Sequence, residues 1–588
     1  DLGQVDGDPR GVLLRDLVED ALNEGADFVE EKTTLTLPEF NLTRESLIEA
    51  RLDIDSASVD IDGNLELNAI DGREADVISG QVTAALDISL ADFILDMWTV
   101  ERDPDTGKFR VAKRPDAPKS EASANEEEEK EVDPGEDSEG ANSFDQADSA
   151  NADGQSNEGS GDSGGGEDNS PISFGLGVSW VRVGGEVDAV IDLRNAGAFS
   201  VAQDIELTAK SETKVMTASA GASVLGNALG AGGAITRQVQ FVRARVVGNG
   251  QLNTGGIGLT ATSDNSMWSM AGVLSIGEDL GFGATLALNE MLARTQTRIS
   301  DDASVFTSAG DVRLAARDDT RVVSMGVAGV GSVNSTGISA ANGVIFNRSA
   351  VDALINGGAT VVSAANVSAE AIRSQELAGL AYQVVIASSV GAGGALGLAV
   401  DKGFTTAKIE DATVRAADDA IVRAQNNTKV VSSGMGGGYG GSAGVTGSIS
   451  ITIKNDTTSA LIADAQVQAG DVLVEALNGG RIDAVGGGDE TFYGAFDQTT
   501  LNVTVGNSAA IGVSVAVIDS SSIVTAAITD GSLVIAENSA SDDGVVGTHR
   551  SEGGDIWLDR QTQTYHGVAV VADNSTEFNT LAMTGSAS

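Results

Sequence analysis

One seven-residue strand motif recurs along this chain, and its repetition constrains the fold more than any other feature. It reads GDVRLAA at Gly310–Ala316 and GDVLVEA at Gly470–Ala476. From Ala209 to Ala476 the copies lie about 52 to 55 residues apart, and a fixed period of this size indicates a repeat architecture. The other copies end at Ala69, Ala209, Ala261, Ala371 and Ala424, and a last, degenerate copy is predicted at Asp555–Arg560.

Each copy of the motif reads as a β-strand with one buried face. It begins with Asp, Asn or Gly, which suit a tight corner, and apolar residues then alternate, as at Val312 and Leu314. A partner strand precedes it, for example ASVFTSA from Ala303. A long Gly/Ala/Ser stretch follows and leads to another β-branched strand, as in Ser432–Ile453. Several short strands per repeat predict two or three coils of about 18 to 26 residues each.

The fold predicted from this pattern is all-β, a parallel β-solenoid (β-helix) built from repeats of about 53 residues. A single coil cannot bury its apolar face alone, so each coil packs on its neighbour. The composition agrees, with 73 Gly but only 4 Trp, 4 Tyr and 15 Phe, because small and β-branched side chains let successive layers approach closely. An array of Greek-key sandwiches is the alternative fold, since strand order is not written in the sequence.

Two interruptions of the repeat divide the chain into three predicted parts. Residues 1–96 form the N-terminal part of the array, residues 97–171 an insertion, and residues 172–588 the β-solenoid repeat region. The insertion is predicted to contain a hairpin with Asp-Pro-Asp-Thr-Gly at its turn, followed by an acidic loop at residues 118–170. That loop has no apolar periodicity and is expected to be disordered.

Two smaller elements complete this organisation. Residues 10–24 are the best helix candidate, because their apolar residues fall near one face. Residues 539–554 form a short insert that delays the last copy of the strand motif.

Charge and composition exclude several classes of function. A net charge of −50 makes nucleic acid a poor partner. The absence of Cys excludes disulfides and thiol chemistry. No apolar run in this piece is long enough for a transmembrane segment. The chain begins at Asp1 without Met or a signal peptide, which we interpret as a piece of a longer polypeptide.

Motifs for catalysis have a simpler structural interpretation in each case. Gly440–Gly444 has the spacing of a nucleophile elbow around Ser442, and Gly436–Gly441 has that of a dinucleotide loop, but no helix is predicted after either. His549 and His566 have no second His or Cys nearby to form a metal site. We therefore expect no enzymatic activity and no catalytic or cofactor-binding residues.

Acidic residues near the N-terminus are the one chemical option that the sequence offers. Strand alternation places Asp60 and Asp62 on one face, where a hard cation such as Ca²⁺ can bridge two carboxylates. The predicted Ca²⁺ ligands are Asp53, Asp55, Asp60 and Asp62. The alternative is that these acids are solvated surface residues.

The Gly-Asp-Val-x-Val-x-Ala strand between Gly/Ala-rich stretches resembles the repeats of large bacterial filamentous surface adhesins. The likeness is to filamentous haemagglutinin-like adhesins and, more closely, to leukotoxin-type filamentous adhesin repeats, over residues 172–536. It implies a structural and adhesive stalk or contact surface, extracellular or on the cell surface. The implied partner is a protein or glycan of a host or neighbouring cell surface.

Two alternatives to the adhesive function stay open at this stage. One is a carbohydrate-active β-helix enzyme, and the other is a subunit of an extracellular filament formed by end-to-end self-association.

Overall fold

The fold is seen in a computed structural model that describes most of the repeat region. The chain divides into two units, residues 1–88 with 172–588, and Ser89–Pro171. In the second unit, β4 (Thr99–Arg102) pairs antiparallel with β5 (Phe109–Ala112), as the predicted hairpin requires. The described residues are 40–54, 58–83, 99–102, 109–112, 172–194, 198–224, 226–479, 481–482, 499–529, 531–537, 544–550, 560–578 and 580–588.

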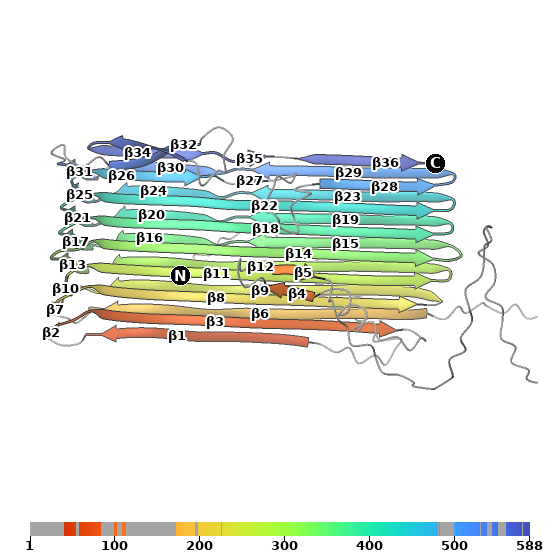
Figure 1. The fold of residues 1–588 in the computed structure, drawn as a ribbon, viewed down its shortest axis with the longest axis horizontal. Coiled ribbons are helices and arrows are strands. Elements are labelled where there is room, and N and C mark those ends of the chain that lie inside the picture. The colour runs from red at the N-terminus through yellow and green to blue at the C-terminus, as the bar shows by residue number, and fades with distance from the viewer. Residues whose placement is uncertain are drawn as a thin grey trace, which may run out of the picture. The chain divides into compact units, whose positions relative to one another are not determined.

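The first unit is a stack of coils that form three parallel sheets, which we call A, B and C (Figure 1). Within each coil, the chain passes first through sheet A, then through sheet B and then through sheet C. Sheet B holds one short strand per coil: β2 (Ser58–Ile61), β7 (Ala198–Val201), β10 (Gln251–Thr254), β13 (Ser304–Thr307), β17 (Thr360–Ser363), β21 (Thr413–Ala416), β25 (Gln466–Ala469) and β31 (Leu533–Ala536). Its 8 strands therefore mark eight coils among the described residues.

Sheets A and C form the two broad faces of each coil. Sheet A contains β1 (Phe40–Asp53), β6 (Ile172–Asp192), β9 (Asn227–Val247), β12 (Leu280–Ser300), β15 (Thr336–Asn347), β16 (Ala350–Asn356), β19 (Val390–Asp401), β20 (Phe404–Glu410), β23 (Ala443–Lys454), β24 (Thr457–Ala463), β29 (Ala509–Ser520) and β30 (Ile523–Ile528). Sheet C contains β3 (Leu65–Thr83), β8 (Ile205–Val224), β11 (Ile257–Gly277), β14 (Val312–Ser332), β18 (Val367–Ala387), β22 (Ala420–Gly440), β26 (Val472–Asn478), β27 (Arg481–Ile482), β28 (Thr499–Gly506), β34 (Val568–Asn574), β35 (Glu577–Phe578) and β36 (Leu581–Ala587).

The predicted parallel β-solenoid is confirmed, but each repeat is one coil and not two or three. Ile257 pairs with Ile205, 52 residues before it, and with Val312, 55 residues after it. All inter-coil pairing in the three sheets is parallel, so the Greek-key alternative is wrong. The short-coil prediction failed because β11, β12 and β14 are 21 residues long. The Gly/Ala/Ser stretches that follow the motif are themselves parts of long strands, as in β14 and β22.

A tight turn joins each full sheet C strand to the next sheet A strand, at the opposite end from sheet B (Figure 1). Only Glu278 and Asp279 separate β11 from β12, and only Gly441 and Ser442 separate β22 from β23. We call the half of sheets A and C next to these turns the flat half, and the half next to sheet B the charged half.

The interior changes in composition from sheet B toward the turns. Beside sheet B lies a large apolar core that includes Phe199, Leu252 and Ile299. A buried polar band with Arg373 and Asp401 follows. A second apolar band then includes Met267 and Met291, and hydroxyl side chains lie beyond it, as in the Thr217–Thr236 contact of 2.7 Å. Interior side chains thus become smaller toward the turns.

In the flat half, sheets A and C approach each other until glycine is the only residue that fits at several positions. A Cβ on Gly379 of β18 would lie 2.5 Å from the carbonyl oxygen of Leu398 on β19, and one on Gly434 would lie 2.5 Å from that of Ile449. The expected close packing is therefore real, but it lies between the two facing sheets rather than between successive coils. Successive coils keep ordinary strand pairing.

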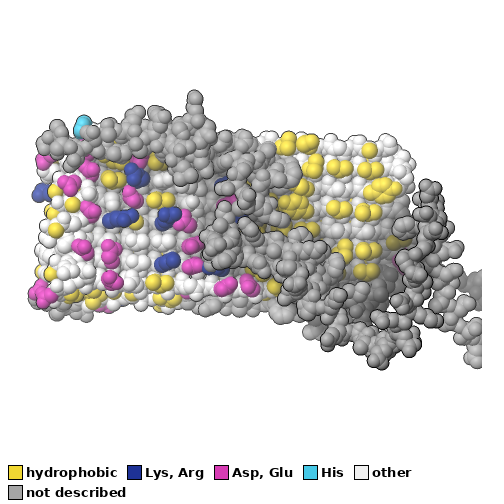
Figure 2. Space-filling view, in the orientation of Figure 1, with side chains coloured by type: hydrophobic (Ala, Val, Ile, Leu, Met, Phe, Trp, Pro, Cys, Tyr) yellow, Lys and Arg dark blue, Asp and Glu magenta, His cyan; other side chains and the backbone are white. Residues whose placement is uncertain are grey.

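The outer surface is divided in the same way. Figure 2 shows charged side chains gathered on the half next to sheet B and apolar ones on the flat half of the face in view. On the outward side of sheet C in the charged half, opposite charges pair across coils. Arg423 Nε lies 2.7 Å from Glu475, which is buried, and its Nη1 lies 3.3 Å from Glu370. Opposite charges on adjacent strands favour this register over a shifted one.

The prediction of the last motif copy at Asp555–Arg560 is wrong. Strand β26 pairs with β34, with Val472 opposite Val568, so the last copy lies at Gly567–Ala572. Before it, β32 (Gly544–Arg550) and β33 (Arg560–Tyr565) form an antiparallel pair, which makes the predicted insert longer. A second insert, between β27 and β28, was not predicted. The helix predicted at residues 10–24 and the acidic loop at 118–170 lie outside the described residues.

Candidate functional site

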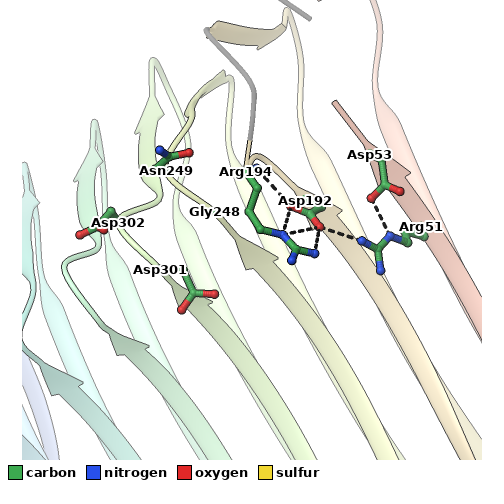
Figure 3. Close-up of a pocket in the computed structure, with 8 residues that line it drawn as sticks. All are labelled: Arg51, Asp53, Asp192, Arg194, Gly248, Asn249, Asp301 and Asp302. Carbon is green, nitrogen blue, oxygen red and sulfur yellow. Dashed lines mark hydrogen bonds and ion pairs between the residues drawn. The ribbon is translucent and has the colours of Figure 1, made fainter. Parts of the chain in front are cut away.

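Among the described residues, a cluster of charged side chains lines an open depression at the corner between sheets A and B, with a volume of about 600 Å³. It spans the ends of three neighbouring sheet A strands, β6, β9 and β12, together with β1 (Figure 3). The strands end here because the chain turns toward sheet B. The residues that line it are Arg51, Asp53, Asp192, Arg194, Gly248, Asn249, Asp301 and Asp302.

Asp192 is the centre of the charge cluster in this depression. Its buried carboxylate accepts a hydrogen bond from Arg51 Nη2 at 2.7 Å and from Arg194 Nε at 2.9 Å. The hydrogen bonds from Arg194 lower the pKa of Asp192, since they stabilise the charged form. Arg51 also donates from Nε to Asp53 at 2.5 Å (Figure 3). Arg51 thus joins the end of β1 to the end of β6, and Arg194 joins the end of β6 to the corner that follows it.

Asp301 and Asp302 form the other side of the depression. Both have positive φ angles, 64° and 63°, and both are exposed. Asp301 lies 3.8 Å from Arg298 Nη2, and the Asp302 N–H donates to the Gly357 carbonyl at 2.8 Å. The contacts of these two residues join neighbouring corners of the solenoid. Among the residues that line the depression, no general base lies beside a nucleophile.

The structure does not bring the predicted Ca²⁺ ligands into one site. Asp53 lies in the corner depression, paired with Arg51. Asp60 is exposed on β2, Asp62 is exposed just after it, and Asp55 lies outside the described residues. Within the described ranges, no three acidic or His side chains gather in a way that could hold a metal ion. Ca²⁺ binding by these residues stays a prediction.

The motifs with catalytic spacing lie in plain strand and turn positions. Ser442 is in the tight turn between β22 and β23, and its carbonyl accepts the N–H of Ser508 at 2.9 Å. Gly436 lies within β22, where a Cβ would be 2.8 Å from Ser448 Oγ. His566 is exposed just before β34, and His549 lies on β32, opposite Gln561.

A buried polar band inside the solenoid was not predicted. It joins Asp318 and Arg373 from sheet C to Asp401 and Lys454 from sheet A, and Arg373, Asp401 and Lys454 have no exposed side-chain surface. Burial raises the pKa of Asp318 to about 6, although Thr320 and Gln375 both donate to it at 2.5 Å. An alignment of the repeats could have revealed this band. Asp318, Arg373 and Asn426 lie opposite one another on adjacent strands. Each lies an even number of residues after the motif's inward-facing apolar residues, so its side chain also faces the interior.

Comparison with known proteins gives no relative for this chain. No protein-family model matches it, and neither the curated proteins nor the solved structures include a match. Among the described residues, no helix is long and apolar enough to cross a membrane.

Proposed function

We propose that this chain is a structural and adhesive segment of a large secreted or surface-exposed bacterial β-solenoid protein. The observation that supports this best is the stack itself. Eight coils among the described residues are joined by parallel pairing in three sheets, and opposite charges pair between adjacent coils on the outward side of sheet C. Such a quasi-one-dimensional array resists bending and presents a long lateral surface, which suits a stalk or a contact surface.

Adhesion to a cell-surface protein or glycan is the specific activity proposed. Beads coated with the purified chain are expected to bind host or neighbouring cells above the level of beads coated with a protein of matched size and charge. Treating the cells with protease or with glycosidases distinguishes a protein partner from a glycan partner. Bead binding no higher than that of the matched protein, on every cell type tried, would contradict the proposal.

A second candidate function is a subunit of an extracellular filament, and the sheet edges that have no partner strand among the described residues favour it. Strands β29 and β30 end the path of sheet A, and β2 and β31 end that of sheet B. Unpaired edges of this kind are templates for pairing with another chain. Electron microscopy of the purified chain separates the two candidates, since end-to-end assembly gives filaments and a solitary segment gives particles of one length.

Enzymatic cleavage of polysaccharide is the outcome that would replace both candidates. The purified chain is expected to release no reducing sugar ends from a panel of acidic and neutral polysaccharides. Release that persists through repurification would contradict an adhesive role.

A further inference from the structure

The outer face of sheet A is almost entirely apolar throughout the flat half. Four outward columns cross seven strands there, and the register of β6, β9, β12, β15, β19, β23 and β29 aligns them. One column runs Phe174, Leu229, Phe282, Ile338, Ala392, Val445 and Ile511, and the next ones begin at Leu176, Val178 and Trp180. The only polar side chain in these columns is Asn342, whose Nδ2 donates to the Thr285 carbonyl at 3.0 Å. We call this surface the apolar face.

The apolar face is accessible and large. Its most exposed bulky side chains range from 36% exposure at Phe282 to 55% at Ile511, with Ile449 at 41%. Four columns about 6.8 Å apart on seven strands about 4.8 Å apart cover about 900 Å². The largest apolar patch on an ordinary monomer is about 300–600 Å². A stable protein interface removes about 800 Å² from each partner, so this face is large enough for one.

On four of its seven strands, the apolar face is bordered directly by charge. The next outward column holds Arg182, Arg237, Glu290 and Asp519 on β6, β9, β12 and β29, and the apolar Phe346, Val400 and Ile453 on β15, β19 and β23. Arg237 pairs with Glu290 at 3.2 Å. A partner that covers the apolar face without desolvating this column must itself be flat, apolar and of about the same width. Sheets with these properties pack face to face about 10 Å apart.

The outer face of sheet C is a poorer surface for such a partner. Its flat half is also apolar, with Val384 and Ile386 exposed. Its central cluster of Val323, Ala378 and Leu380, however, has at most 2% exposure and is therefore already covered. The apolar face of sheet A is the more accessible of the two, although Val344 in its fourth column is only 5% exposed.

We propose that the apolar face of sheet A binds the apolar face of a second copy of this chain. The two copies are related by a two-fold axis parallel to the direction in which the coils stack. This rotation places each coil opposite the same coil of the partner and makes the charged halves point in opposite directions. A two-fold axis along the strands would instead overlay the two charged halves of a chain with net charge −50. The interface is isologous, so it closes as a dimer. It is independent of the adhesive function.

Analytical ultracentrifugation of the full chain tests the dimer. The native chain is expected to sediment as a dimer at micromolar concentration. A variant with Leu286→Lys and Ile449→Lys, both in the third column, is expected to sediment as a monomer, with a dissociation constant raised at least about 100-fold. The matched control carries Val384→Lys and Ile386→Lys on the outer face of sheet C and is expected to remain a dimer.

A distance measurement tests the orientation without touching the apolar face. The chain has no Cys, so Lys408→Cys on β20 can carry a single nitroxide label in the charged half. With the charged halves pointing apart, the two labels in a dimer lie more than about 60 Å apart, given about 3.3 Å per strand residue. Overlaid charged halves would bring the labels within about 30 Å.

Several outcomes would overturn the proposal. They are a native chain that stays monomeric up to about 100 μM, dissociation by the sheet C substitutions but not by the sheet A ones, and a short distance between the Lys408 labels. A monomer that binds only neutral lipid vesicles through this face would also overturn it. If the lysine variant loses the circular dichroism of the native fold, the milder Ile449→Thr variant replaces it and is expected to weaken the dimer.

Discussion

Arg373 on β18 and Asp401 on β19 form an ion pair inside the solenoid, where neither side chain has solvent-exposed surface. The guanidinium also donates from Nε to Ser349 Oγ at 3.0 Å and from Nη2 to Gln375 Oε1 at 2.7 Å. A buried charge is tolerated when its partners compensate for the hydration that it loses. Removing one partner leaves the other charge buried with its desolvation free energy uncompensated. This pair therefore fixes how sheets A and C meet at the boundary between the two apolar bands.

Replacing Arg373 is expected to destabilise this part of the stack strongly. Arg373→Met leaves the Asp401 carboxylate buried without its counter-ion, and the loss expected is about 3–5 kcal/mol. Repeat arrays do not unfold in a single step, so hydrogen exchange of the β18 and β19 amides is the appropriate measurement. The control is Arg317→Met, because its pair with Asp319 is 57% and 35% exposed and should contribute less than about 1 kcal/mol. Equal effects of the two substitutions would contradict this.

The stability of the same region is expected to decrease as pH rises through about 6. Burial raises the pKa of Asp318 from 3.8 to about 6, so the folded state favours the protonated carboxyl. The stability that this group contributes is complete below about pH 4 and is lost as the pH passes 6, for a total of about 2–3 kcal/mol. Arg373 and Asp319 are the charged groups that act on it.

The Asp318→Asn variant separates this effect from other titrations. Hydrogen exchange of the β14 and β18 amides measures the free energy of local opening at pH 4 and at pH 7.5. The difference between the two pH values should be about 2–3 kcal/mol smaller in the variant than in the native chain. Asp319→Asn, at the adjacent outward position, serves as the control and should keep the native pH dependence. A native chain and an Asp318→Asn variant with parallel pH profiles would refute the assignment.

A single methyl group is expected to disrupt the close contact between the sheets in the flat half. Gly379→Ala places a Cβ 2.5 Å from the backbone oxygen of Leu398, which cannot move without shifting β19. Overpacking of this kind costs about 1–3 kcal/mol, measured as faster amide exchange in β18 and β19. Gly394→Ala is the matched control in the next strand, since a Cβ added there would meet no heavy atom within 4 Å. The control should be neutral or slightly stabilising.

The corners and the first half of each sheet C strand could be predicted because their alternation is regular. Val312 and Leu314 alternate with polar residues, and the chain places Asp311 at the corner before them. The second half of the same strands could not be predicted from this signal. Residues 432–440 of β22 are mostly glycine and serine, since the facing sheet leaves no room for larger inward side chains. Small residues on both faces remove the period-2 contrast that identifies a strand.

The candidate sites were harder to predict than the fold, because they depend on what faces each strand. Arg373 follows Val367, Ala369 and Ala371 at the same inward parity, so its direction is readable from the sequence. Its partner Asp401 is 28 residues away on another sheet, and no local pattern connects them. The corner depression was equally hard to predict, because Arg51 and Asp192 are 141 residues apart in the chain, on either side of the insertion.

The corner between sheets A and B is expected to tolerate only residues that adopt positive φ. Asp411 has a φ of 46°, Asp464 has 48°, and the preceding coil has Gly357 and Gly358 at this corner, with φ of 63° and 79°. A β-branched residue is strained in this conformation, so Asp411→Val should destabilise the coil by about 1–2 kcal/mol, while Asp411→Gly should be neutral or slightly stabilising. The control is Asp418→Val at the exposed corner between sheets B and C, where the backbone does not adopt positive φ. Amide exchange of β20 and β21 measures all three variants. If valine is tolerated as well at position 411 as at position 418, the positive φ at this corner does not restrict which residue can stand there.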